Sequence, residues 1–360
     1  MTSEDRLAPA YRSIERFKAD GVKGAGLVVA KGGEIVGEYY AGMANTDREA
    51  DAETIWPLAS ISKLYTAAAA MSLIEQGEIA LSTKASSIFP SFTKAGRGQI
   101  TLRHLLTHTS GLPYESDHMA ERLAAKISLE AMVGEAYDCP MLFAPGKDQS
   151  YSDYGIGLAG LMCAEVAGIS FPELVRTRVL VPGGLHNTFM PPPDDVTERI
   201  AYVDGALAEH TDGAMYNSLH ARGLAHPAFG TIASARDLLR FGLLFDLNCP
   251  HRLFSRVGTT VMTTDQTGYD FPDHVTEPMS PSVQAWGLGF QVKGSMTFPE
   301  LVSPSAFGHP GASGCIVCVD PKWDVAFSFV SNRHLNLGYD TWTDRLMQIT
   351  NVVMSCMTND

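Results

Sequence analysis

Ser60 and Lys63 are the residues whose types and spacing first suggest chemistry. They lie in "PLASISKLYTAAAAMSLIEQ", which takes a helical pattern from this pair onward. Residues three apart share one face of a helix, and a helix N-terminus offers free N–H groups and a partial positive charge. A serine hydroxyl needs a base to become a strong nucleophile, and lysine is such a base only when its pKa is depressed. Taken alone, the pair favours a capping serine beside a solvated lysine over a catalytic pair.

Two distant segments carry polar residues that extend this pattern. The stretch "YSDYGIGLAG" places Tyr151 and Asp153 directly before a helical pattern. The stretch "FGHPGASG" places His309 before a run typical of a strand. The chain therefore contains Ser-x-x-Lys, Tyr-Ser-Asp and His-Pro-Gly in that order.

This ordered series resembles the penicillin-recognising serine hydrolases, which include class C β-lactamases, DD-peptidases and family VIII carboxylesterases. Three further stretches resemble the same family: "ITLRHLLTHTSGLP" (100–113), "FGTIASARDLLRF" (229–241) and "WGLGF" (286–290). The resemblance covers roughly residues 20–335. Within the family, the third motif His-x-Gly is familiar from the esterase branch.

The resemblance implies a role for each matching residue. Ser60 is expected to be the acylated nucleophile, and Lys63 to take its proton, directly or through the phenol of Tyr151. Tyr151 would pass the proton to the leaving group and then activate water for deacylation. The backbone N–H groups of Ser60 and Ala312 would hold the oxyanion. Tyr154 is a competing phenol, but the family register "Y-S-D-x-G-x-x-L-x-G" favours Tyr151.

Two departures from the β-lactamase pattern direct the expected substrate toward esters. Asp153 stands where β-lactamases of this type have asparagine, and an ionised carboxylate donates no hydrogen bond. His309 and Pro310 stand where they have lysine and threonine, so a permanent cation for a substrate carboxylate is lost. We therefore expect uncharged carboxylic esters, with Asp153, His309, Gly311 and Trp286 contributing to substrate binding. Trp286 is equally compatible with packing against the sheet.

Other functions are open at this point. An amide-cleaving relative (a β-lactamase, D-amino-acid peptidase or amidase) would use the same residues. An acyltransferase would deliver the acyl group to an alcohol rather than to water. A non-catalytic binding module would use the fold alone.

The elements that would position these residues lie near both ends of the chain. Strand patterns occupy 24–31, 34–42, 286–294, 313–320 and 324–332. Gly32-Gly33 is a two-residue hairpin signal, and short turns between strands require antiparallel pairing. We therefore expect an α/β (α+β) fold of the β-lactamase/transpeptidase type, with an antiparallel sheet flanked by helices and an all-helical subdomain.

The domain boundaries follow from where strand patterns stop and resume. Between residues 83 and 227 short helical patterns alternate with Pro- and Gly-rich loops. We expect 83–227 to form the helical subdomain and 1–82 with 228–360 to form a discontinuous sheet domain, with the active site in the cleft between them. An amphipathic helix is expected at 232–245 and a final helix at roughly 338–357.

The composition of the chain limits the kinds of binding partner and the cellular location that we expect. The formal net charge of −13 argues against nucleic acid or an anionic membrane as partner, because both need basic patches. No apolar run approaches ~18 residues, so no transmembrane helix is expected. The N-terminus lacks the apolar core of a secretory signal, which indicates a cytoplasmic protein with reduced cysteines; a mature protein with its leader removed is the alternative.

Two residue pairs with metal-like spacing are expected to be structural. Cys315 and Cys318 have CxxC spacing within a strand-like run, and His104 and His108 lie four apart without a third ligand nearby. We expect no metal and no cofactor. The expected partner is a small-molecule ester, and the sequence does not predict an oligomeric state.

Overall fold

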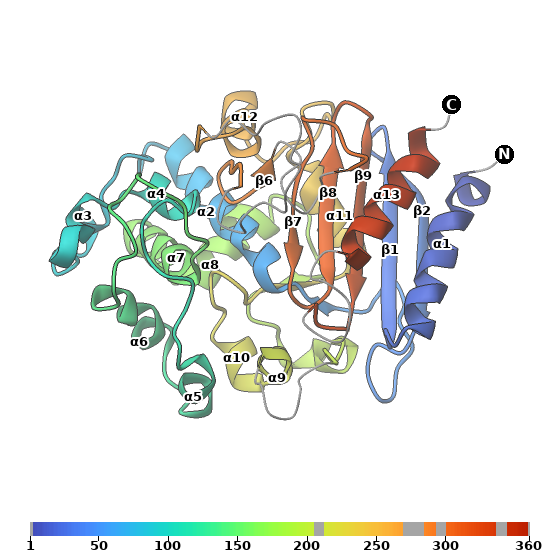
Figure 1. Cartoon of the computed structure of the whole chain (residues 1–360), viewed down its shortest axis with the longest axis horizontal. Helices are drawn as coiled ribbons and strands as arrows, with labels where there is room; N and C mark the ends of the chain where they lie inside the picture. Colours follow the sequence, from blue (N-terminus) through green and yellow to red (C-terminus); the bar gives the residue numbers. More distant parts are fainter. Residues whose placement is uncertain (1–2, 205–211, 269–283, 293–299, 336–343, 359–360) are drawn as a thin grey trace.

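The computed structural model describes residues 3–204, 212–268, 284–292, 300–335 and 344–358 (Figure 1). Within this part of the chain, six strands form an antiparallel sheet in the order β2-β1-β9-β8-β7-β6, and three short strands form a second sheet in the order β3-β5-β4. The strands are β1 (Gly24–Lys31), β2 (Glu34–Gly42), β3 (Trp56–Pro57), β4 (Thr188–Phe189), β5 (Ile232–Ala233), β6 (Gln291–Val292), β7 (Phe307–Gly311), β8 (Cys315–Asp320) and β9 (Val325–Ser331).

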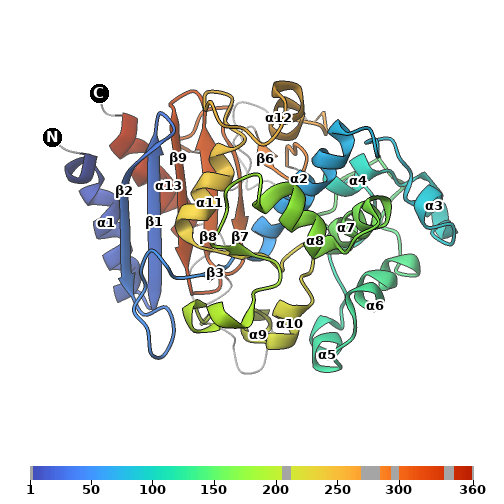
Figure 2. The same cartoon turned by 180° about the vertical axis from the view of Figure 1, so that it is seen from behind.

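The α-helices gather on both faces of the large sheet and in a cluster beside it (Figures 1 and 2). They are α1 (Ser3–Ala19), α2 (Ser62–Glu75), α3 (Ala85–Ile88), α4 (Leu102–Leu106), α5 (Met119–Ala124), α6 (Leu129–Gly134), α7 (Asp153–Ala167), α8 (Phe171–Val175), α9 (Asp212–Asn217), α10 (Leu219–Gly223), α11 (Ala235–Leu243), α12 (Arg256–Thr263) and α13 (Asp344–Thr358). Helices α1 and α13 cover one face of the sheet and α11 covers the other. The expected fold class is confirmed.

The sheet joins the two ends of the chain because β1 pairs with both β2 and β9. The β1–β2 turn is the expected hairpin, since Gly32 and Gly33 have φ of 59° and 82°, a region that glycine enters without steric cost. Leu27 of β1 lies opposite Phe329 of β9 in the antiparallel register. Alternate β1 residues face two different cores: Leu27 faces the core under α1 and α13, and Val28 the core shared with α2 and α11.

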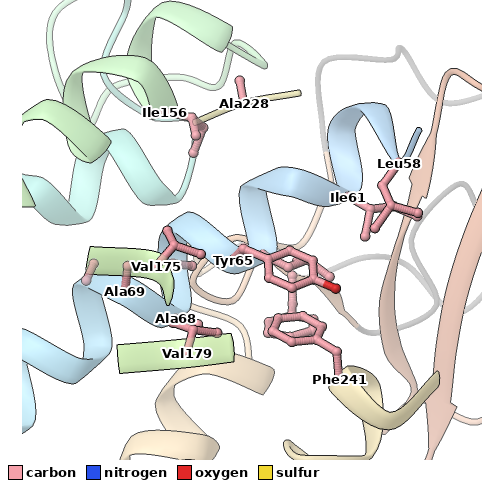
Figure 3. Packing of buried hydrophobic residues seen from close by; sticks show 14 of the residues in the cluster. Leu58, Ile61, Tyr65, Ala68, Ala69, Ile156, Val175, Val179, Ala228 and Phe241 are labelled. Atoms are coloured by element: carbon pink, nitrogen blue, oxygen red, sulfur yellow. The ribbon is translucent and has the colours of Figure 1, made fainter. Parts of the chain in front are cut away.

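Helix α2 lies between the sheet and the helical cluster (Figure 2). Nearly all of its residues are buried, which explains why its sequence is apolar on all sides rather than along one stripe. Tyr65 stacks on Phe241 of α11 with ring centroids 3.9 Å apart, and Ala68 packs near Val175 and Val179 (Figure 3). The helix is thus fixed from several directions, and residues at its N-terminus are held firmly.

One expected strand differs from the structure, and one expected helix is described only in part. The strand expected at 286–294 is limited to β6, because Gly289 has φ of 75° and the Gly287 N–H donates to the Phe290 carbonyl in a turn. Positions 293 and 294 lie outside the described residues. The helix expected at 338–357 corresponds to α13, and 338–343 lie outside the described residues.

The helix expected at 232–245 is confirmed as α11 and begins after an N-cap at Ser234. The division into a sheet domain and a helical subdomain stays a prediction. In the described part of the chain, no single helix is long and apolar enough to cross a membrane. Two consecutive helices, Asp153–Ala167 and Phe171–Leu180, would together be long and apolar enough, and they are bent by 79° relative to each other.

Candidate active site

Ser60 follows a tight turn that leads from β3 into α2. Ala59 has φ of 48°, a left-handed conformation that costs a non-glycine residue roughly 1–2 kcal/mol. Ala59–Ile61 form one turn of 3₁₀ helix, and α2 continues from Ser62. Only 8% of Ser60 is exposed, and it lines a cavity of about 320 Å³. The strained turn therefore presents the serine to this cavity at the head of a buried helix.

The end of β7 is fastened against the same turn. A Cβ atom added to Gly311 would lie 2.2 Å from the Leu58 carbonyl oxygen, so only glycine permits this approach. The Ser313 hydroxyl donates to the Pro57 carbonyl at 2.6 Å. Ala312, between these two contacts, lines the cavity together with Ser60. The lack of a side chain at Gly311 therefore allows the backbone of β7 to lie directly against the turn that carries Ser60.

Lys63 is completely buried and its ammonium makes several polar contacts. Its Nζ lies 2.7 Å from Asp153 Oδ1, and it donates to Ser60 Oγ and to the Ala228 carbonyl, each at 3.1 Å. It also lies 4.6 Å from the centre of the Tyr151 ring. The structure thus brings Ser60 and Lys63 together with Tyr151 and Asp153, although 88 positions or more separate the two pairs in the sequence.

The charge of Lys63 is set by Asp153. Burial lowers the pKa of Lys63, but the carboxylate of Asp153 and then Tyr151 outweigh it, so this pKa lies above its ordinary value. The depressed pKa that a lysine base requires is therefore not what this environment produces. Burial raises the pKa of Asp153, and the ammonium of Lys63 opposes that shift. The 2.7 Å contact is that of a buried ion pair.

Tyr151 is held on the loop that precedes α7. Its phenol interacts with the side chains of Lys63 and Ser60. Burial raises the pKa of Tyr151, Lys63 lowers it and Asp153 raises it again, with a net shift upward. The competing phenol of Tyr154 points elsewhere, because it donates to Glu135 at 2.9 Å.

His108 supports Tyr151 from behind. Its Nδ1 accepts a hydrogen bond from the Ser152 N–H at 3.1 Å, and its ring lies 4.5 Å from that of Tyr151. Because Nδ1 accepts, the proton of the neutral ring is on Nε2. The sequence predicts a structural role for His108 but not the residues that its ring contacts. His104 caps α4 by exchanging hydrogen bonds with Thr101.

His309 and Trp286 lie behind Tyr151, away from the described lining of the cavity. Both are 1% exposed, and their rings lie 6.1 and 5.8 Å from that of Tyr151. His309 Nδ1 donates to the Pro310 carbonyl at 2.5 Å. Burial lowers the pKa of His309 to about 3, so the ring is neutral at pH 7. Both rings pack against Tyr151, and the expected contact of His309 and Trp286 with substrate stays a prediction.

The cavity wall contains several residues that no motif marks. Its described lining consists of Ser60, Tyr114, Glu115, Tyr151, Asp153, Met215, Tyr216, Phe229, Ala312 and His334. Four of the predicted residues are among them: Ser60, Tyr151, Asp153 and Ala312. The others come from loops and short helices whose positions depend on the tertiary fold. In the part of the chain that the structure describes, no group of three His, Cys, Asp or Glu side chains is arranged to hold a metal.

Comparisons with known proteins agree with the family resemblance of the sequence. The family model described as Beta-lactamase matches residues 12–350. Penicillin-binding protein 4 of Amycolatopsis lactamdurans is 27% identical, over 83% of this chain and 78% of the relative. A putative D-alanyl-D-alanine carboxypeptidase of Salmonella enteritidis is 25% identical, over 79% of this chain and 70% of the relative. A solved family VIII carboxylesterase superimposes with a TM-score of 0.78 at 20% identity, covering 98% of this chain and 97% of that one.

Proposed function

Since this chain belongs to the Beta-lactamase family, and so to the serine hydrolases, we propose that it cleaves small carboxylic esters through a covalent acyl-serine intermediate. One observation carries the choice of substrate: the cation nearest to the nucleophile, Lys63, is already paired with Asp153 at 2.7 Å. His309, in the position where β-lactamases carry a lysine, is neutral at pH 7. The described site therefore lacks the unpaired cation that a carboxylate-bearing lactam or peptide needs.

Acylation begins with attack of Ser60 Oγ on the ester carbonyl carbon. Tyr151 accepts the serine proton as the new C–O bond forms, and it does so in its ionised form, which is reached on the alkaline side because its pKa lies above its ordinary value. The backbone N–H groups of Ser60 and Ala312 hold the developing oxyanion. When the tetrahedral intermediate collapses, the bond to the alcohol breaks, and Tyr151 returns the proton to the leaving oxygen.

Deacylation runs through the same groups. Tyr151 takes a proton from a water molecule, which attacks the acyl carbon, and Ser60 regains its proton as the acid departs. Lys63 stays charged throughout and stabilises the phenolate of Tyr151, in agreement with its raised pKa. Asp153 positions Lys63, and its expected direct contact with substrate is secondary to this pairing.

Hydrolysis assays with matched chromogenic substrates test the proposal. We expect turnover of short-chain p-nitrophenyl esters and no turnover by Ser60→Ala. Gly134→Ala is the matched control, because a Cβ atom added there meets nothing within 4 Å. Faster turnover of a chromogenic cephalosporin or a D-alanyl dipeptide than of the esters would favour the amide-cleaving relatives instead. Transfer of the acyl group to added alcohol in preference to water would indicate an acyltransferase.

A further inference from the structure

A short segment beside the nucleophile, residues 225–230, is bound to the first turns of α2. Every residue of this segment is buried. The Ala228 carbonyl accepts a hydrogen bond from Lys63 Nζ at 3.1 Å, and the Pro227 carbonyl accepts one from Thr66 Oγ1 at 2.7 Å. Lys63 and Thr66 are three residues apart and share one face of the helix. The conformation of the segment therefore decides where one polar contact of Lys63 lies.

The ring of His226 holds this segment at Ala228. Its Nδ1 accepts a hydrogen bond from the Ala228 N–H at 3.1 Å. Burial lowers the pKa of His226 to about 3, so the ring is neutral at pH 7, with its proton on Nε2 and a lone pair on Nδ1. The next N–H, that of Phe229, donates to the His226 carbonyl at 3.2 Å. Both peptide groups that flank Ala228 are thus bound to His226.

The same ring also supports the cavity wall. The rings of His226 and Phe229 are stacked, with centroids 4.1 Å apart and planes within 4° of parallel. Phe229 lines the cavity that contains Ser60, and it also lines a second space of about 10 Å³. That second space has about the room that one water molecule needs. Phe229 therefore separates the two spaces, and its stack on His226 limits how far the larger cavity extends.

We propose that His226 is a positioning residue with two separate roles. Its Nδ1 orients the Ala228 carbonyl toward Lys63, and its ring face holds Phe229 as the wall that limits the acyl group of the substrate. The acyl group is assigned to this wall because the leaving alcohol belongs at Tyr151 and the oxyanion at Ala312. This inference rests on the proposed acyl-serine mechanism and deepens it.

Two substitutions at position 226 separate these roles. His226→Phe keeps an aromatic ring for the stack and lacks the acceptor. His226→Asn lacks the ring and keeps an acceptor, because an asparagine side chain can accept from the N–H two residues further on. The hydrogen bonds that the His226 carbonyl accepts from Phe229 and Gly230 remain in both variants, so we expect both to fold. The same two substitutions of His251 are the matched controls, because His251 is exposed and is not in the described lining of either space.

Hydrolysis of p-nitrophenyl acetate tests the role of Nδ1. We expect His226→Phe to lower kcat roughly tenfold to a hundredfold with little change in KM, because a small displacement near the reacting groups is enough to lose that much. His226→Asn should keep kcat close to that of the wild type. Equal losses of kcat in the two variants, or wild-type kcat in His226→Phe, would overturn this role.

The acetate, butyrate and octanoate esters of p-nitrophenol share one leaving group and test the role of the ring. We expect His226→Asn to raise the ratio of kcat/KM for octanoate over acetate severalfold, because Phe229 without its stack no longer separates the two spaces. Phe229→Ala should raise the same ratio, and His226→Phe should leave it unchanged. A ratio that stays constant in His226→Asn and Phe229→Ala, or that changes equally in all three variants, would overturn this role.

Labelling with a fluorophosphonate separates the failure of this inference from the failure of the proposed function, because it needs no ester. Ser60 Oγ bonds to phosphorus, fluoride leaves, and the serine proton passes to the base. If the wild type is labelled but hydrolyses no ester, the esterase proposal is wrong, and slower labelling of His226→Phe than of His226→Asn still supports the role of Nδ1. If all variants are labelled and hydrolyse the esters like the wild type, the esterase proposal stands and the inference about His226 is wrong. A wild type that is neither labelled nor active on esters would contradict both.

Discussion

Asp153 and Lys63 form a buried ion pair, with 2.7 Å between the carboxylate and the ammonium, and the same ammonium lies 3.1 Å from the hydroxyl of Ser60. In β-lactamases of the type that the sequence resembles, the position of Asp153 holds a neutral asparagine. The carboxylate raises the pKa of both Lys63 and Tyr151. The exchange of one amide for one carboxylate therefore changes which group can serve as the base.

Replacing this carboxylate should move the pH dependence of activity. Asp153→Asn removes a contribution that raises the pKa of Lys63 and of Tyr151, so both groups lose their protons at lower pH. We expect the ascending limb of the kcat/KM profile to shift toward acid by about one pH unit or more. Profiles of the wild type and the variant with one p-nitrophenyl ester measure the shift. A limb that stays in place would show that neither group is the base.

The close approach of Gly311 to Leu58 should be essential for turnover. Gly311→Ala places a methyl group 2.2 Å from a backbone oxygen, so β7 and the Ala59–Ile61 turn must separate. The N–H of Ala312 then moves away from the oxyanion, and loss of one such donor lowers kcat by roughly 10²–10³. Gly134→Ala is the control. Wild-type kcat in Gly311→Ala would exclude this backbone geometry from catalysis.

Buried His309 should make the fold sensitive to acid. Its pKa is about 3 in the folded protein, against an ordinary value near 6.5. The unfolded chain therefore binds the proton first, so the stability that neutral His309 contributes is present above pH ~6.5 and is lost as pH falls toward 3. We expect the free energy of unfolding to fall by up to about 1.4 kcal/mol per pH unit from this group.

Denaturant unfolding of the wild type and of His309→Gln between pH 7 and pH 4 measures this contribution. The variant should lose stability less steeply, because glutamine does not titrate. Parallel curves for the two proteins would show that His309 does not contribute to acid unfolding.

Part of the fold could be predicted from local sequence alone. Gly32 and Gly33 marked the hairpin, and the strand patterns at 24–31 and 34–42 agree with β1 and β2. The strand expected at 286–294 is too long because its residues are largely apolar, as in a buried strand. The turn at Gly287 and Gly289 depends on backbone conformation, which side-chain polarity does not indicate.

The candidate site was predictable only where motifs exist. Motif spacing and order identified Ser60, Lys63 and Tyr151, and the structure brings these three together. The charge of Lys63 depends on a carboxylate 90 residues away in the chain, which no local pattern measures. Glu115 and Tyr216 lie in segments without a family motif, and their place in the cavity wall follows only from tertiary packing.

Formation of an acyl-enzyme on Ser60 tests the central claim most directly. The protein is mixed with p-nitrophenyl acetate, quenched in acid within the first turnover, and digested for mass spectrometry. The account predicts one acetyl group on the peptide that contains Ser60, and none in Ser60→Ala. An acetyl group on Lys63 or Tyr151 alone, or release of p-nitrophenol at the wild-type rate by Ser60→Ala, would contradict it.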